Sequence, residues 1–127
     1  MNLKCTENQN KAAISDYLAY MGIHHWRQNS GGYAGEYKKK DGKKKKRFFW
    51  FMQWLFPNKE EGLVFLDIGG ILLDGRYFEV EVKATGKEPS KGQYYTIAYI
   101  KTSTNAEALW ADSINMFIEK FERIIRH

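Results

Sequence analysis

This chain of 127 residues contains one cysteine, two prolines and no hydrophobic run of about 18 residues. The single Cys5 excludes an internal disulfide and any zinc site built from several cysteines. It also fits a reducing cytoplasm. Residues 1–7 contain no apolar segment of the kind that directs export. We therefore expect a soluble cytoplasmic protein that has no membrane partner.

Apolar side chains are nevertheless abundant enough to form a packed core. Hydrophobic residues make up 43% of the chain and aromatic residues 16%, which differs from the composition of disordered proteins. A chain of this length supports one core, and neither an internal repeat nor a linker divides it. We therefore expect a single domain over residues 1–127.

Positive charge is concentrated in one short segment. The formal net charge is +5, yet residues 38–47 sum to +7 and the remaining 117 residues to −2. Such a patch is typical of phosphate-binding proteins, and a polyanionic partner would relieve the repulsion between its charges. The alternative is a solvated hairpin tip that only aids solubility. The basic side chains are Lys38, Lys39, Lys40, Lys43, Lys44, Lys45, Lys46 and Arg47.

The first half of the chain reads as a helix followed by strands. Apolar spacings of three and four predict a helix over 7–21, which Thr6 or Asn8 could cap and Gly22 would end. A strand is expected over 23–27 and a loop over 29–32. Strands over 33–40 and 43–51 flank Asp41-Gly42, a dipeptide favoured in two-residue hairpin turns. Lysines on both faces of the tip predict a basic hairpin, at about 35–50, that projects into solvent.

The second half alternates between strands and helices. A polar turn over 57–62 precedes apolar segments over 63–68 and 71–73, which suggest a strand with a bend or bulge at Gly69-Gly70. Asp74-Gly75 is a second hairpin turn that leads into a strand over 76–84. A loop over 85–91, a helix from Ser90 to about residue 101, a strand over 108–111 and a helix over 113–125 follow. One stripe of the last helix carries Ile114, Phe117, Ile118, Phe121 and Ile125. The order α-β-β-β-α-β-α predicts an α/β fold with a central mixed sheet flanked by helices.

Two acids and a lysine on neighbouring strands form the strongest candidate site. Glu81 and Lys83 share one face of the expected strand, and Asp67 arrives from the preceding strand. Mg²⁺ prefers a few carboxylates with water and substrate oxygens, so Asp67, Glu81 and the carbonyl of Val82 could bind it. Lys83 could orient a water molecule or stabilise developing charge. This arrangement suits hydrolysis of phosphodiester bonds.

A plainer interpretation is an exposed strand face that carries Glu79, Glu81 and Lys83. The E-x-K triplet alone is a weak signal, and Glu79 on the same face is expected to have an outer or structural role. His24 and His25 face opposite ways and have no partner at metal-ligand spacing, and Cys5 has no adjacent base. The apolar run over 48–56 is expected to be buried on both sides or covered by a partner chain. Its Trp50 and Trp54 could also stack on bases.

Taken in order, these residues resemble the virus-type replication-repair nuclease (VRR-NUC) domain of the PD-(D/E)XK restriction-endonuclease-like superfamily. The similarity covers nearly the whole chain and is more specific than any single motif. The segments that carry it are Glu7 with the first helix and Gly22, Trp26–Gly31, Asp67–Ile71, Asp74–Phe78, Glu81–Lys83, Ser90 to Gln93, and Trp110–Ser113 with the last helix.

The resemblance implies a restriction-endonuclease-like core and a role for each matched residue. Asp67, Glu81 and Glu7 would bind Mg²⁺ or Mn²⁺, Lys83 would be the catalytic lysine, and Gln93 would support the active site. No small-molecule cofactor is implied.

The matched segment at Arg27 and Asn29 would join the basic hairpin in contacting nucleic acid. Stand-alone members of the family are commonly bacterial or phage proteins, often homodimeric, that cleave four-way DNA junctions. The likeness thus implies a bacterial cell or a phage-infected host. This chain departs from the family pattern at Leu66, where many members have proline or a small polar residue, and in its longer, more basic hairpin.

Three hypotheses remain open from the sequence. The first is a homodimeric endonuclease selective for branched DNA, because two active sites related by a two-fold axis match a four-way junction. The second is a monomeric nuclease that acts on flaps, nicked duplex or a specific sequence. The third is a non-catalytic nucleic-acid-binding module.

Overall fold

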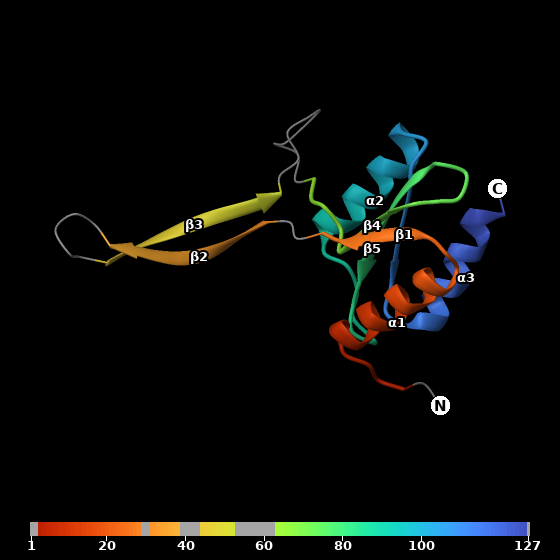
Figure 1. Cartoon of the computed structure of the whole chain (residues 1–127), viewed down its shortest axis with the longest axis horizontal. Helices are drawn as coiled ribbons and strands as arrows, with labels where there is room; N and C mark the ends of the chain where they lie inside the picture. The colour runs from red at the N-terminus through yellow and green to blue at the C-terminus, as the bar shows by residue number, and fades with distance from the viewer. Residues whose placement is uncertain (1–2, 29–30, 39–43, 53–62, 127) are drawn as a thin grey trace.

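Four strands form an open mixed sheet at the centre of the fold (Figure 1). They are β1 (His24–Arg27), β4 (Ile68–Ile71), β5 (Tyr77–Val82) and β6 (Glu107–Ala111), in the order β1-β4-β5-β6. The pairs β1·β4 and β4·β5 are antiparallel, and β5·β6 is parallel. This computed structural model describes residues 3–28 and 63–126, together with the backbone of residues 31–38 and 44–52. The predicted α/β class with a mixed sheet is confirmed.

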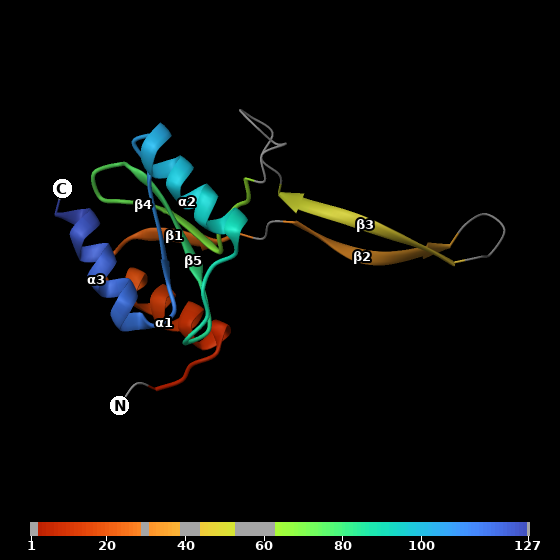
Figure 2. The same cartoon turned by 180° about the vertical axis from the view of Figure 1, so that it is seen from behind.

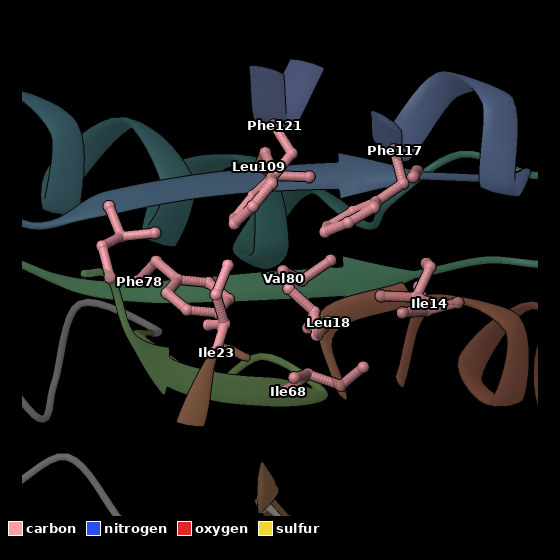
Figure 3. Close-up of a cluster of buried hydrophobic side chains, with 12 residues drawn as sticks. Ile14, Leu18, Ile23, Ile68, Phe78, Val80, Leu109, Phe117 and Phe121 are labelled. Atoms are coloured by element: carbon pink, nitrogen blue, oxygen red, sulfur yellow. The ribbon is translucent and has the colours of Figure 1, made fainter. Parts of the chain in front are cut away.

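Helices cover both faces of this sheet (Figures 1 and 2). They are α1 (Glu7–Tyr20), α2 (Lys91–Ser103) and α3 (Ile114–Ile125). Helices α1 and α3 enclose the larger apolar cluster with β5 (Figure 3), whereas α2 packs Ile100 against Leu66 and Ala108 in a smaller one. The larger cluster includes Ile14, Leu18, Ile23, Ile68, Phe78, Val80, Val82, Leu109, Phe117 and Phe121. Helices α1 and α3 thus cover one face of the sheet and α2 covers the other. Successive side chains of β5 therefore point alternately towards α1 and α3 or towards α2.

The first helix has the boundaries that its sequence predicts. Thr6 caps it reciprocally with Gln9, since each side chain accepts a hydrogen bond from the other residue's backbone N–H. Gly22, with a φ of +71°, follows the helix. The buried Asn10 donates to the carbonyl oxygens of Lys83 and Asp112, at 2.9 and 2.8 Å. These bonds join α1 to the ends of β5 and β6.

Serine caps set the start of the other two helices. Ser90 and Gln93 form a capping box at α2, and the Ser113 side chain accepts from the N–H of Met116 at α3. The stripe predicted on α3 is confirmed at Phe117 and Phe121, which are fully buried. It is wrong at its end, because Ile125 is 39% exposed.

The strand expected over 63–68 with a bend at its glycines is wrong. Residues 63–66 are not in a strand, and Gly69 and Gly70 lie within β4. The backbone of 63–66 uses side chains as partners: Val64 N–H donates to Thr96 Oγ1, and Leu66 N–H to Glu79 Oε1. Residues 63–66 are therefore apolar, as a buried strand would be, but their backbone bonds to side chains instead of to a neighbouring strand.

Both glycines of β4 allow close approach rather than a bend. A Cβ on Gly69 would lie 2.7 Å from Gln28 Cδ, and one on Gly70 would lie 2.6 Å from the carbonyl oxygen of His24. The turn that follows is confirmed: Gly75 has a φ of +93° and its N–H donates to the carbonyl of Leu72. The strand expected over 76–84 is observed as β5.

The basic segment forms a hairpin of β2 (Gly31–Lys38) and β3 (Lys44–Met52). These strands pair antiparallel in a separate two-stranded sheet that extends away from the central sheet (Figures 1 and 2). The loop expected over 29–32 is wrong at Gly31 and Gly32, which lie in β2. The Asp41-Gly42 turn, the tip at 39–43, Trp54 and the turn at 57–62 lie outside the described residues.

Apart from the hairpin, the helices and the strands of the central sheet run α1, β1, β4, β5, α2, β6 and α3 along the chain. The two hairpin strands stand between β1 and β4, so the described elements run α-β-β-β-β-β-α-β-α. No helix in the described part of the chain is long and apolar enough to cross a membrane.

Candidate active site

Asp67 lies immediately before β4 and reaches across to the end of β5. Its Oδ2 accepts a hydrogen bond of 2.8 Å from the N–H of Val82, which fixes the Asp67 carboxylate beside the neighbouring Glu81. The N–H and C=O of one strand residue point to the same side, so the Val82 carbonyl lies on the Asp67 side of β5. The structure thus brings together the two strand acids and the carbonyl that the sequence singled out.

Glu81 is a buried carboxyl in an electrostatically unfavourable place. Its exposed fraction is 3%, and burial together with the charge of Asp67 raises its pKa from 4.5 to about 8. The charge of Glu7 acts in the same direction, and that of Lys83 opposes it. Two acids that repel each other in a shielded place favour either a proton or a cation between them.

Lys83 and Gln93 both contact the same oxygen of Glu81. Lys83 Nζ lies 3.6 Å from Glu81 Oε2, and Gln93 Nε2 donates to that oxygen at 2.9 Å. The Oε1 of Gln93 accepts from the N–H of Ser90 at 2.8 Å. The capping box that starts α2 therefore also orients the side chain that touches Glu81.

Lys11 is a site residue that the sequence interpretation missed. Its Nζ lies 3.3 Å from Glu7 Oε2 and 3.5 Å from Asp67 Oδ1. The ammonium therefore links Glu7 on α1 to the pair on the sheet. The spacing of Glu7 and Lys11, four residues apart on a helix, was the available signal. Nothing in the sequence indicated that Lys11 would reach Asp67.

The described residues provide two converging carboxylates rather than a complete cage. Within 3–28 and 63–126, no group of three or more His, Cys, Asp or Glu side chains is close enough to hold a metal ion. The donor set still fits a hard divalent cation that keeps several waters, because such ions need only one or two carboxylates. Asp67, Glu81 and the Val82 carbonyl would hold it. Glu7 would approach if Lys11 moved away.

A second buried network lies beside this site on the same face of β5. Gln28 Nε2 donates to Glu79 Oε1 at 2.6 Å and to the carbonyl of Leu66 at 3.2 Å. Its Oε1 accepts from Tyr77 Oη at 2.8 Å and from Trp26 Nε1 at 3.1 Å. The amide thus uses both donors and both acceptor positions.

This network holds the segment that carries Asp67. Glu79 Oε1 also accepts from the N–H of Leu66, and the N–H of Gln28 donates to the carbonyl of Asp67 at 2.7 Å. Glu79 is fully buried, its Oε2 has no hydrogen-bond partner among the described residues, and burial raises its pKa. The exposed strand face considered for Glu79 and Glu81 is therefore wrong. The outer, structural role expected for Glu79 agrees with these contacts.

The remaining candidates take different places. The ring of His25 bonds to Ser15 Oγ at 2.7 Å and to the carbonyl of Ile23 at 2.9 Å, which is a structural role. Cys5 pairs its backbone with Thr85. Arg27 is exposed at the end of β1, and Asn29 lies outside the described residues.

The basic residues at 38–47 are placed only in part. The backbone of Lys38 and of residues 44–47 lies in the hairpin strands. Their side chains, and residues 39–43, lie outside what the structure describes.

Comparison of this chain with models of protein families, with curated proteins and with solved structures found no match.

Proposed function

We propose that this protein is a metal-dependent DNA endonuclease that hydrolyses phosphodiester bonds. The observation that carries the proposal is the convergence of Asp67 and Glu81 on adjacent strands, with Lys83 and Gln93 on the same oxygen of Glu81. A pair of repelling carboxyls with an ammonium at its edge suits a divalent cation and a phosphate. The likeness of these residues to a VRR-NUC domain with a restriction-endonuclease-like core supports the same proposal.

Each residue has a role that its contacts suggest. A bound Mg²⁺ or Mn²⁺ would lower the pKa of a water molecule and neutralise charge on the phosphate. Asp67 and Glu81 hold the cation. Lys83 places its positive charge next to the attacked phosphate. Gln93 keeps the Glu81 carboxylate turned towards Asp67.

DNA is the proposed substrate because positive charge is concentrated in one segment of the chain, residues 38–47. The strand β1 carries Arg27 at its end and leads into the hairpin that bears the basic side chains of 38–47. Phosphate contacts of this kind supply sequence-independent affinity for nucleic acid. We further propose branched DNA, with a four-way junction as the preferred form, and a homodimer whose two sites each cut one strand.

A cleavage assay tests the proposal directly. Linear duplex, single strands, flaps and four-way junctions are incubated with the protein in Mg²⁺, Mn²⁺ or EDTA. We expect metal-dependent cuts, most rapid on the junction, and a dimer in sedimentation. Cutting confined to flaps by a monomer would select the second hypothesis from the sequence.

Substitution of Glu81 tests the assignment of the site. Glu81→Gln keeps the size and a hydrogen-bond acceptor for Gln93 but removes the negative charge, so we expect loss of cleavage with unchanged DNA binding in EDTA. Glu88→Gln, an equivalent change at an exposed acid, is the control and should cut as the unaltered protein does. Retained cutting by Glu81→Gln would refute the assignment.

One observation favours a second candidate, a nucleic-acid-binding module without catalysis. Only two carboxylates converge among the described residues, and no third His, Cys, Asp or Glu side chain joins them. Calorimetric titration with Mn²⁺ separates the two functions. An endonuclease should bind the ion and lose that binding in Asp67→Asn, whereas a pure binding module should show no heat of binding.

A further inference from the structure

A groove of about 500 Å³ runs along the outer edge of the central sheet. Strand β6 forms its floor, and α2 and α3 form its two walls. Two aromatic rings and three cationic side chains distinguish it from the other surfaces of the described chain. They are Tyr94, Trp110, Lys101, Lys120 and Arg123.

The groove has an excess of positive charge. Glu107 is the one acid among the described residues that line it, and Arg76 Nη1 binds its Oε1 at 3.0 Å. Lys101 is exposed, and Arg123, which pairs with Glu119 on its own helix, is 73% exposed. Glu119 thus balances Arg123, and no acid in the described lining remains to pair with Lys101 or Lys120.

Lys120 is held in a fixed position inside the groove. Its Nζ donates to the carbonyl of Trp110 at 2.8 Å and lies 4.2 Å from the centroid of the Trp110 ring. Burial lowers the pKa of Lys120, and the charge of Lys101 adds to this while Asp112 opposes it. Because burial disfavours the charged ammonium, a further anion bound beside it would stabilise it.

The inner end of the groove lies beside the proposed active site. Tyr94 directly follows Gln93, which binds Glu81, and Trp110 is the partner of Glu81 in the register of β5 and β6. The two rings contact each other edge to face, with centroids 6.1 Å apart. On α2 the groove begins at Tyr94, one residue after the Gln93 that contacts Glu81. On β6 it begins at Trp110, which pairs with Glu81.

We propose that this groove binds the phosphodiester backbone of the nucleic-acid strand that leads away from the cleaved bond. The inference rests on the proposed function and adds a second basic surface to the hairpin. The ligand is an extended polyanion because the cations lie along α2 and α3 rather than around one point, and because Tyr94 and Trp110 bring the groove next to Gln93 and Glu81.

Two other occupants fit the groove less well. Base stacking would need a free aromatic face, but Lys120 lies over the Trp110 ring and Tyr94 meets that ring edge-on. Pairing with a strand of a second copy would need the outward carbonyl of Trp110, which Lys120 already occupies. Phosphate groups need only positive charge within reach, and Lys101 and Arg123 extend into solvent.

The test compares two arginines of the same helix. Arg123 lines the groove and Arg126 does not, yet each pairs with a glutamate four residues earlier and their side chains are 73% and 74% exposed. Affinities for fluorescent duplex and single-stranded DNA are measured in EDTA over a range of salt. The proteins are the full chain, Lys101→Glu/Arg123→Glu, and Arg126→Glu.

We expect the double variant to bind about tenfold more weakly or worse at low salt. If each of the two side chains contacts one phosphate, the slope of log affinity against log salt should become shallower by about 1.8 on duplex and by about 1.4 on single strands. Arg126→Glu should stay within about twofold of the full chain. The difference between duplex and single strand identifies which form occupies the groove.

The outcomes separate this inference from the proposed function. If the unaltered protein binds and cuts DNA but the double variant behaves as Arg126→Glu does, the groove is not a binding surface and only this inference falls. A loss of dimer in sedimentation by the double variant alone would instead make the groove an interface between copies, which also overturns it. If the unaltered protein binds no DNA, the proposed function fails as well.

Discussion

A proton held by Glu81 links the candidate site to the stability of the fold. In the unfolded chain this carboxyl loses its proton near its ordinary pKa of 4.5, whereas in the fold it does so only near 8. Between these values the folded state binds more protons than the unfolded state. The contribution of Glu81 to stability is therefore fully present below about pH 4.5 and is lost as the pH rises from there through about 8.

Replacing Glu81 should remove this dependence. We expect the free energy of unfolding in EDTA to fall by roughly 1–3 kcal/mol between about pH 5 and pH 9 in the unaltered protein, and by clearly less in Glu81→Gln. Chemical denaturation at a series of pH values measures both. Glu79, whose pKa burial also raises, is present in both proteins and cancels in the comparison. Equal pH profiles would show that Glu81 is ionised normally in the fold.

Glu79 should affect metal binding although it does not face the metal. It accepts from the backbone of Leu66 and from Gln28, and so holds the segment that ends in Asp67. Glu79→Gln keeps an acceptor oxygen, whereas Glu79→Leu leaves two buried donors unpaired, at a cost of about 1–3 kcal/mol each. We expect Glu79→Leu to weaken Mn²⁺ binding about 10- to 100-fold.

The matched variant decides whether Glu79 positions Asp67 or only stabilises the fold. Calorimetry should give Glu79→Gln a Kd for Mn²⁺ within about threefold of the unaltered protein. If Glu79→Leu loses stability but binds Mn²⁺ equally well, its role is confined to folding and the positioning account is wrong.

The sequence predicted the parts of the site that depend on strand alternation. Asp67, Glu81 and Lys83 follow from the periodicity of β5 and a turn at Asp74-Gly75, and the structure brings them together. Gln28 and Glu79 could not be paired in advance, since 51 residues separate them and only the assembled sheet makes them neighbours. The sequence alone also does not distinguish a buried glutamate in a strand from an exposed one.

At the scale of elements, β4 shows how the same glycines can be misread. Two adjacent glycines in an apolar run suggest a bend, but here both lie in a regular strand. Their missing side chains make room for Gln28 on one face and for Phe78 on the other. Helix caps were easier to predict, because Thr6, Ser90 and Ser113 act on residues only three positions away.

Gly69→Ala should therefore damage both the fold and the metal site. Its Cβ would lie 2.7 Å from Gln28 Cδ and 2.9 Å from Trp26 Nε1. Displacing Gln28 should cost about 1–3 kcal/mol of stability. It should also weaken Mn²⁺ binding, because the Gln28 side chain bonds to Glu79 and to the carbonyl of Leu66, the residue before Asp67.

Gly75→Ala is the matched control at the neighbouring turn. Nothing lies within 4 Å of its added Cβ, but its φ of +93° disfavours a side chain, at a cost of about 1–2 kcal/mol. Denaturation and Mn²⁺ titration of both variants separate the effects. A normal Mn²⁺ affinity in Gly69→Ala would show that Gln28 does not position Asp67.

At the scale of the whole molecule, the hairpin is structurally separate from the rest. Strands β2 and β3 pair with each other and not with the central sheet, and they extend away from it (Figure 1). A change of charge at the tip should therefore alter partner binding without altering the stability of the core.

Replacing Lys43, Lys44, Lys45 and Lys46 by glutamine tests this separation. If each contacts a phosphate, the salt dependence of duplex binding should fall by up to about 3.6 log units per log of salt. The thermal midpoint and the affinity for Mn²⁺ should not change. The same four positions changed to arginine keep the charge and should bind DNA as the unaltered protein does.

The glutamine variant also decides between the two interpretations of the basic segment. A tip that only aids solubility would give a variant that binds DNA with the same salt dependence but precipitates at lower concentration. A tip that binds phosphates would give a variant whose DNA binding has a shallower salt dependence, because four of the eight basic side chains of residues 38–47 are removed. Comparison with Lys101→Glu/Arg123→Glu then shows whether the hairpin and the groove act on one strand. If they contact separate phosphates, their effects on log Kd should add.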